Sequence, residues 1–147
     1  MKMIQIALLL GLAALLTAGC GSKADRCAKC GMLVEDYPRW IAGGVDRTGK
    51  AERFCCPRCM FVWLRGSRGE GAREPWITEY YQQQRQPIDQ VFFVIGSDVT
   101  GPMGKDLVPV KDRPAAERFL SDHHGTRIVQ ANEITADLLK EIIGKPH

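Results

Sequence analysis

The chain has 147 residues, of which 45% are hydrophobic, 25% are charged and six are cysteine. Its formal net charge is +3, or about +2 without the leader that carries Lys2, which is too weak to indicate nucleic acid or anionic lipid as a partner. The length suits one domain or two very small ones.

The N-terminus predicts a targeting segment. Lys2 precedes an almost unbroken apolar run over residues 4–16, too short for a membrane span with these flanks. Small residues then lead into Cys20, an order that resembles a bacterial lipobox. The resemblance implies that residues 1–19 are a signal peptide, that Cys20 is acylated and that residues 20–26 tether a protein of the cell envelope to the lipid bilayer, on its extracytoplasmic face. An ordinary signal peptide with a cysteine nearby is the alternative.

Two groups of cysteines follow, and their spacing predicts a thiolate metal site. The first is Cys27-x-x-Cys30, and the second, 25 residues later, is Cys56-x-x-Cys59. With Cys20 acylated, five thiols remain, an odd number that a purely disulfide-bonded framework does not fit. A methionine beside each group favours a soft ion such as Cu(I). A disulfide within the first group is the alternative.

The first half, residues 27–88, is expected to be a treble-clef-like metal module. Its predicted elements, in order, are a strand, a strand, a helix and a strand, at residues 39–46, 51–55, 57–64 and 76–81. Cys56 and Cys59 lie where the second strand passes into the helix. Free N–H groups and the helix dipole favour thiolates there.

Three more sulfur-bearing residues near the cysteine pairs are possible ligands. Cys55 and Cys56 are neighbours on an extended segment, so we expect them to point to opposite faces and only one to face the ion. The spacing favours Cys56 without deciding between them, and the other would be a small buried hydrophobe. Met32 and Met60 are weaker candidates, since packing explains both.

The second half, residues 89–147, has the same predicted order followed by one more helix. The strands are expected at residues 91–95, 106–110 and 126–130, and the helices at 113–124 and 135–143. Leu138, Leu139, Ile142 and Ile143 are expected on the inner side of the last helix. The fold class is therefore α+β, with two small related ββαβ halves.

Met103 is a candidate metal ligand for a different reason. It lies in the glycine-rich loop of residues 97–105, within Gly101-Pro102-Met103-Gly104. A methionine that fills a core belongs at a periodic position inside an element, whereas this loop would present the thioether for binding. No G-x-S-x-G, H-E-x-x-H or phosphate-loop motif occurs. We therefore expect neither an enzyme nor a small-molecule substrate.

These motifs resemble two overlapping families. Residues 27–64, with Cys27-x-x-Cys30-Gly-Met and Cys55-Cys56-x-x-Cys59 before a helix, are similar to YHS/TRASH-type metal-binding modules. The wider pattern resembles the NosL family. It comprises Cys20, the Cys-Gly-Met of residues 30–32 and the stretch Val-Ile-Gly-Ser-Asp-Val-Thr-Gly-Pro-Met-Gly at residues 94–104.

The second resemblance implies a function. It implies two similar ββαβ halves in a Cu(I)-binding envelope lipoprotein that delivers copper to nitrous-oxide reductase. Copper would be held by cysteine from the first pair and by Met103. As a departure from the single Cys-Met of the family, this chain has Phe-Cys-Cys-Pro-Arg-Cys-Met at residues 54–60.

The extra thiols keep other functions open. Cys27, Cys30, Cys56 and Cys59 would complete a closed four-thiolate site, which is typical of structural zinc, whereas Cu(I) transfer favours an open site. A zinc-stabilised protein-binding module of the cell envelope is therefore the alternative function. A thiol–disulfide oxidoreductase using Cys56-Pro-Arg-Cys59 is less favoured, because a hairpin precedes that helix instead of a βαβ unit.

Overall fold

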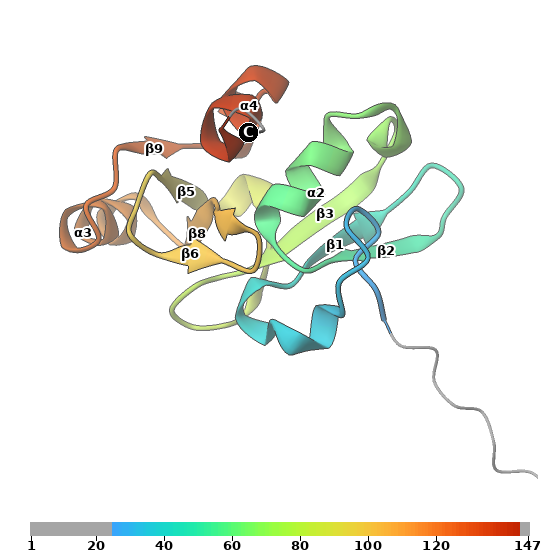
Figure 1. The fold of residues 1–147 in the computed structure, drawn as a ribbon, viewed down its shortest axis with the longest axis horizontal. Coiled ribbons are helices and arrows are strands. Elements are labelled where there is room, and N and C mark those ends of the chain that lie inside the picture. Colours follow the sequence, from blue (N-terminus) through green and yellow to red (C-terminus); the bar gives the residue numbers. More distant parts are fainter. Residues whose placement is uncertain (1–24, 145–147) are drawn as a thin grey trace, which may run out of the picture.

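The computed structural model describes residues 25–144 (Figure 1). The predicted signal peptide, Cys20 and all but the last two residues of the predicted tether lie outside this range. Among the described residues, no helix combines the length and the apolar character that a membrane crossing requires.

The first half is a four-stranded antiparallel sheet covered on one face by a helix. The sheet order is β2-β1-β3-β4, and α2 follows β2 in the chain. The bounds are β1 Ala42–Val45, β2 Ala51–Phe54, α2 Pro57–Leu64, β3 Arg73–Thr78 and β4 Arg85–Pro87. Short 3-10 helices lie at Val34–Asp36, Pro38–Trp40, Ser67–Gly69 and Ile88–Gln90. Ala42 fixes the register, since it pairs with Phe54 on one side and Ile77 on the other.

The second half repeats this plan with a smaller sheet in the order β8-β5-β9. A two-stranded hairpin, β6-β7, is inserted between β5 and β8, and α4 follows β9. The bounds are β5 Phe92–Ile95, β6 Thr100–Gly101, β7 Gly104–Lys105, β8 Val108–Val110, α3 Arg113–Asp122, β9 Arg127–Val129, the 3-10 helix Ala131–Glu133 and α4 Ala136–Ile143. In both halves the first strand lies between the second and the third, so the predicted pair of related ββαβ halves is confirmed.

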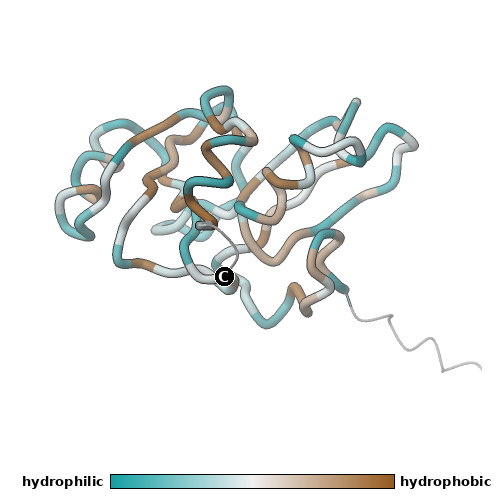
Figure 2. Tube along the Cα trace, turned by 45° about the horizontal axis from the view of Figure 1, so that its top comes forward, coloured by the Kyte–Doolittle hydropathy of each residue, from teal (hydrophilic) through white to brown (hydrophobic). Residues whose placement is uncertain are grey.

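The sequence interpretation missed some local features. The strand predicted from residue 39 begins at Ala42, because Pro38–Trp40 forms a 3-10 helix. Strand β4 and the β6-β7 hairpin were not expected, since three-residue and two-residue strands carry too little pattern to be detected. The inner face of α4 was correct for Leu138, Leu139 and Ile142 but wrong for Ile143, whose side chain is 44% exposed. Figure 2 shows the alternation of hydrophobic and hydrophilic residues along this last helix.

The two halves share one core. Phe61 of α2 meets Phe93 of β5 edge to face, with ring centroids 5.2 Å apart. Tyr80, after β3, packs in the same way on Phe119 of α3, also at 5.2 Å, and its N–H donates to the carbonyl of Pro109. Aromatic rings from each half thus pack against the other half and join the two sheets through one core. The boundary between residues 88 and 89 stays a prediction.

A second link joins the C-terminal end of α2 to the last segment of the chain. The Arg65 guanidinium donates to the carbonyl of Ile134 at 2.6 Å and to that of Ala131 at 2.8 Å. Helix α4 lies beside α2 (Figure 1). The helix that carries a cysteine pair is therefore held at its C-terminal end and on its side.

Gly69→Ala should destabilise the protein, because the loop after α2 lies directly on the helix end. A Cβ atom at Gly69 would stand 2.6 Å from the Leu64 Cα and close to the Trp63 carbonyl, which are backbone atoms that cannot rotate away. We expect a loss of about 1–3 kcal/mol in the free energy of unfolding, measured by urea denaturation. Gly66→Ala is the matched control, since its nearest atom is 3.4 Å away. Equal losses in the two variants would contradict the packing described.

Candidate metal centre

The first arm of the site is a tight turn formed by residues 27–31. The Gly31 N–H donates to the Cys27 carbonyl at 2.9 Å, and the Cys27 N–H donates to the Met32 carbonyl at 2.8 Å. Gly31 has a φ of 80°, a conformation that a side chain at this position would strain. The Ala28 N–H donates to the Arg53 carbonyl, which fixes the turn against β2. Both cysteines of the first pair are thereby presented on one side of a rigid loop.

The second arm is the junction between β2 and α2. Cys56 is the N-cap residue of α2, in an extended conformation, and Pro57 occupies the first helical position, where its missing N–H costs nothing. Cys59 lies in the first turn of the helix. A cysteine turn, a β-hairpin and a helix N-terminus thus form the predicted treble-clef arrangement.

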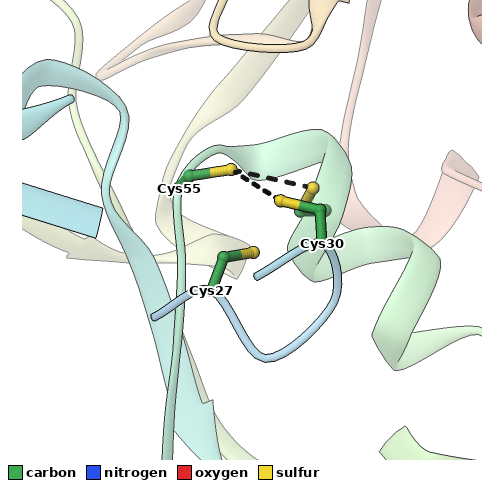
Figure 3. A group of neighbouring side chains, drawn as sticks. Cys27, Cys30 and Cys55 are labelled. Carbon is green, nitrogen blue, oxygen red and sulfur yellow. Dashed lines mark hydrogen bonds between the residues drawn. The ribbon is translucent and has the colours of Figure 1, made fainter. Parts of the chain in front are cut away.

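Four sulfur atoms from these arms converge. The Sγ atoms of Cys27, Cys30, Cys55 and Cys59 all lie within 4.8 Å of one another. Cys55 Sγ is 3.5 Å from Cys30 Sγ and 3.8 Å from Cys59 Sγ, and the labelled side chains point toward one another in Figure 3. Four thiolates at ~2.3 Å from one tetrahedral ion would be ~3.8 Å apart, so the spacing suits a thiolate-bound metal. All five cysteines in the described range are free thiols.

Cys55, the possible ligand in the sequence interpretation, belongs to this group of four, whereas Cys56 does not. The Cys56 Sγ nevertheless lies 4.0 Å from the Cys55 Sγ. The two side chains do not point to opposite faces as expected, because the chain bends at both residues before entering α2. Five sulfur atoms are therefore contiguous.

Burial of these thiols is uneven. Cys55 and Cys56 are fully buried and Cys27 and Cys59 nearly so, whereas Cys30 is exposed. A metal ion bound by the group of four would be reached from solvent on the side of Cys30. Of the four sulfur ligands, Cys30 is accessible to solvent and the other three are buried.

Hydrogen bonds among the thiols set their protonation in the metal-free protein. A hydrogen bond from the Cys59 thiol lowers the pKa of Cys27 to about 4, and one from Cys56 lowers the pKa of Cys55. The donors respond oppositely: the hydrogen bond to Cys27 raises the pKa of Cys59, and the one to Cys55 raises that of Cys56. Desolvation raises the pKa of Cys30 to about 11. These hydrogen bonds thus favour the thiolate form of Cys27 and Cys55 over that of their partners, and the thiolate is the form in which a cysteine binds a metal.

Asp106, which sequence reasoning did not identify, reaches this site from the second half. Its Oδ1 accepts hydrogen bonds from the backbone N–H groups of Arg58 and Leu107, both at 2.8 Å, and so it caps α2 from outside the helix. Burial raises its pKa to about 6, although the Cys56 thiol and the two N–H groups act in the opposite direction. A partner 48 residues away along the chain leaves no local sequence signal for such a cap.

The predicted methionine ligands differ in their burial. Met60 is fully buried in α2, as a packing residue would be. Met32 and Met103 are half-buried against the core. Met103 lies in the turn of the β6-β7 hairpin, and the Arg58 guanidinium donates to the carbonyl of Lys105 at 3.1 Å, which attaches this hairpin to the first turn of α2.

Comparisons with known proteins agree with this architecture. The sequence model of the NosL family matches residues 21–139. The copper-binding lipoprotein NosL of Stutzerimonas stutzeri is 24% identical over 133 residues, which cover 84% of this chain and 69% of that protein. The crystal structure of the copper chaperone NosL from Shewanella denitrificans superposes with a TM-score of 0.70 at 23% identity, covering 82% of this chain and 96% of that chain. The structural likeness supports the fold.

Asp106→Asn should change how stability depends on pH in the reduced, metal-free protein. The pKa of Asp106 is about 6 when folded, against an ordinary value of 3.8, so the folded state binds the proton more tightly. The wild type should therefore lose about 3 kcal/mol relative to the variant as the pH rises from about 4 to above 6. Urea denaturation across this range measures the difference.

Asp106→Ala is the companion variant. It removes the acceptor of two backbone hydrogen bonds and should be less stable than Asp106→Asn at every pH, by about 1–2 kcal/mol. Wild type and Asp106→Asn curves that run parallel from pH 4 to 7 would contradict the raised pKa.

Proposed function

Because the chain belongs to the NosL family, we propose that it is a Cu(I)-binding protein that delivers copper to an enzyme of the cell envelope. The observation that carries the proposal is the convergence of the Cys27, Cys30, Cys55 and Cys59 sulfur atoms within 4.8 Å. Thiolates are soft ligands that select Cu(I) over harder divalent ions. The relatives named above, a copper-binding lipoprotein and a copper chaperone, support copper as the cargo.

The proposed ligands differ in their roles in retaining and releasing the copper ion. The buried thiols Cys27, Cys55 and Cys59 retain the ion, and the exposed Cys30 is the ligand that a partner replaces first. Transfer then proceeds by ligand exchange, in which each new bond to the partner's soft ligand forms as one to this protein breaks. Cys56, the ligand favoured by spacing, stays a candidate through its position beside Cys55, and Met103 through its hairpin at the start of α2.

The client and the anchor are further parts of the proposal. We propose nitrous-oxide reductase as the client, by resemblance to the NosL family, and acylation of Cys20 as the membrane anchor. The relative named as a lipoprotein supports the anchor. We also propose that the protein is not an enzyme, in line with the names of its relatives.

A zinc-stabilised module is the second candidate, and one observation favours it. Four sulfur atoms at near-tetrahedral spacing, with three of their residues buried, suit a structural zinc ion as well as they suit Cu(I). The metal content of the anaerobically purified protein separates the two functions. One zinc ion that Cu(I) neither displaces nor joins would assign the cluster to stability and place the function elsewhere.

Cys55→Ser should weaken binding of the first Cu(I) ion by at least about tenfold, because it removes the central sulfur of the group of four. Cys56→Ser should leave that first affinity within about threefold of the wild type. The measurement is competition with a chromophoric Cu(I) chelator at less than one equivalent of copper. A larger loss of Cu(I) affinity in Cys56→Ser than in Cys55→Ser would instead identify Cys56 as the ligand.

Met103→Ile should lower Cu(I) affinity by roughly tenfold if the thioether completes the site, since isoleucine fills similar volume without a donor atom. The thermal unfolding midpoint of the metal-free protein should stay within about 3 °C of the wild type. The same chelator competition measures the affinity. An unchanged affinity in this variant would remove Met103 from the site.

A further inference from the structure

The fifth thiol gives the cluster more sulfur than one ion requires. Cys55 Sγ has three sulfur neighbours, at 3.5 Å in Cys30, 3.8 Å in Cys59 and 4.0 Å in Cys56. It is therefore a central sulfur atom, within reach of both arms of the site. Cys56 is fully buried and takes part in no disulfide, so its sulfur is available to a second ion beside the first.

The coordination chemistry of Cu(I) makes this surplus significant. A thiolate sulfur retains lone pairs after binding one Cu(I) ion and can bridge to another. Cu(I) with thiolates is satisfied by two or three ligands, whereas zinc in a structural site takes four. Five contiguous thiols with one of them in the centre therefore match two Cu(I) ions that share a ligand better than they match one.

We propose that the cluster binds two Cu(I) ions bridged by Cys55. The outer ion is held by Cys27, Cys30 and Cys55, and the inner ion by Cys55, Cys56 and Cys59. This inference rests on the proposed function, because it takes Cu(I) as the cargo. Each ion displaces the protons of the thiols that it binds, and these leave to the solvent.

Positive groups lie near such a cluster and oppose the buried carboxylate of Asp106, which raises the pKa of Cys56. Five thiolates exceed the charge of two Cu(I) ions, so a net negative charge remains. The Arg26 guanidinium lies against the cysteine turn, where it donates to the Gly31 carbonyl at 2.9 Å, and Lys29 lies between the first two cysteines in the chain. The first turn of α2 adds the positive end of its dipole on the side of Cys56 and Cys59.

Unequal exposure gives the two ions different roles. The outer ion has the exposed Cys30 among its ligands, whereas the three ligands of the inner ion are all buried. The outer ion is therefore the one transferred to the client. The inner ion, whose ligands all come from the junction between β2 and α2, becomes accessible to a partner only after the outer ion has left.

Stoichiometry tests this inference directly. The full chain carrying Cys20→Ala, purified anaerobically in detergent, has only the five thiols of the cluster. Native mass spectrometry during Cu(I) titration should show two ions per chain, and X-ray absorption should show a Cu–Cu scattering path. Cys56→Ser in the same background should bind one ion and lose the Cu–Cu path.

Serine is a suitable replacement because it is a favoured N-cap residue, so α2 should form in the variant, as circular dichroism will check. Cys56→Ala provides a second variant without any donor atom. One ion in the parent chain, or two ions in both Cys56 variants, would overturn the bridged pair while leaving Cu(I) binding intact. A parent chain that binds no Cu(I) would instead reject the proposed function itself.

Discussion

The hydrogen bond between Asp106 and the first turn of α2 is the constraint on which the rest of the molecule depends. A helix N-terminus has N–H groups without partners inside the helix, and burying them unpaired would cost roughly 1–3 kcal/mol each. Asp106 accepts from Arg58 in that turn and from its own neighbour Leu107. Because Cys56 and Cys59 belong to the same turn, the position of the second half also fixes that of the sulfur atoms.

Bringing five thiols together is unfavourable without a cation. Several thiolates in a buried space repel one another, and burial disfavours each charge. Hydrogen bonds between the thiols lower the pKa of Cys27 and Cys55 and raise the pKa of their partners Cys59 and Cys56. A bound cation reverses this balance. Metal binding is therefore expected to stabilise the fold at the cysteine turn, where few apolar side chains are available to do so.

The elements with strong local patterns could be predicted from the sequence, and those fixed by distant contacts could not. Pro57 and Gly66 bracket α2, and the run at residues 92–95 gives β5 almost as expected. The choice between Cys55 and Cys56 depended on whether the chain stayed extended, and a bend at both residues changed the geometry. Asp106 could not be identified because its partner Arg58 lies in a helix of the other half, 48 residues away along the chain, where no spacing rule applies.

The two halves share a plan but cap their helices differently, and this difference explains why they form one unit. In the second half, Asp112 caps α3 with its own side chain, which accepts from the Ala115 N–H at 2.8 Å. In the first half the N-cap residue is Cys56, whose side chain makes no such bond. A sulfur atom has taken the place of a capping oxygen, and Asp106 of the second half supplies the missing acceptor. The N-terminus of α2 can therefore carry cysteine in place of a capping residue only while the second half is packed against the first.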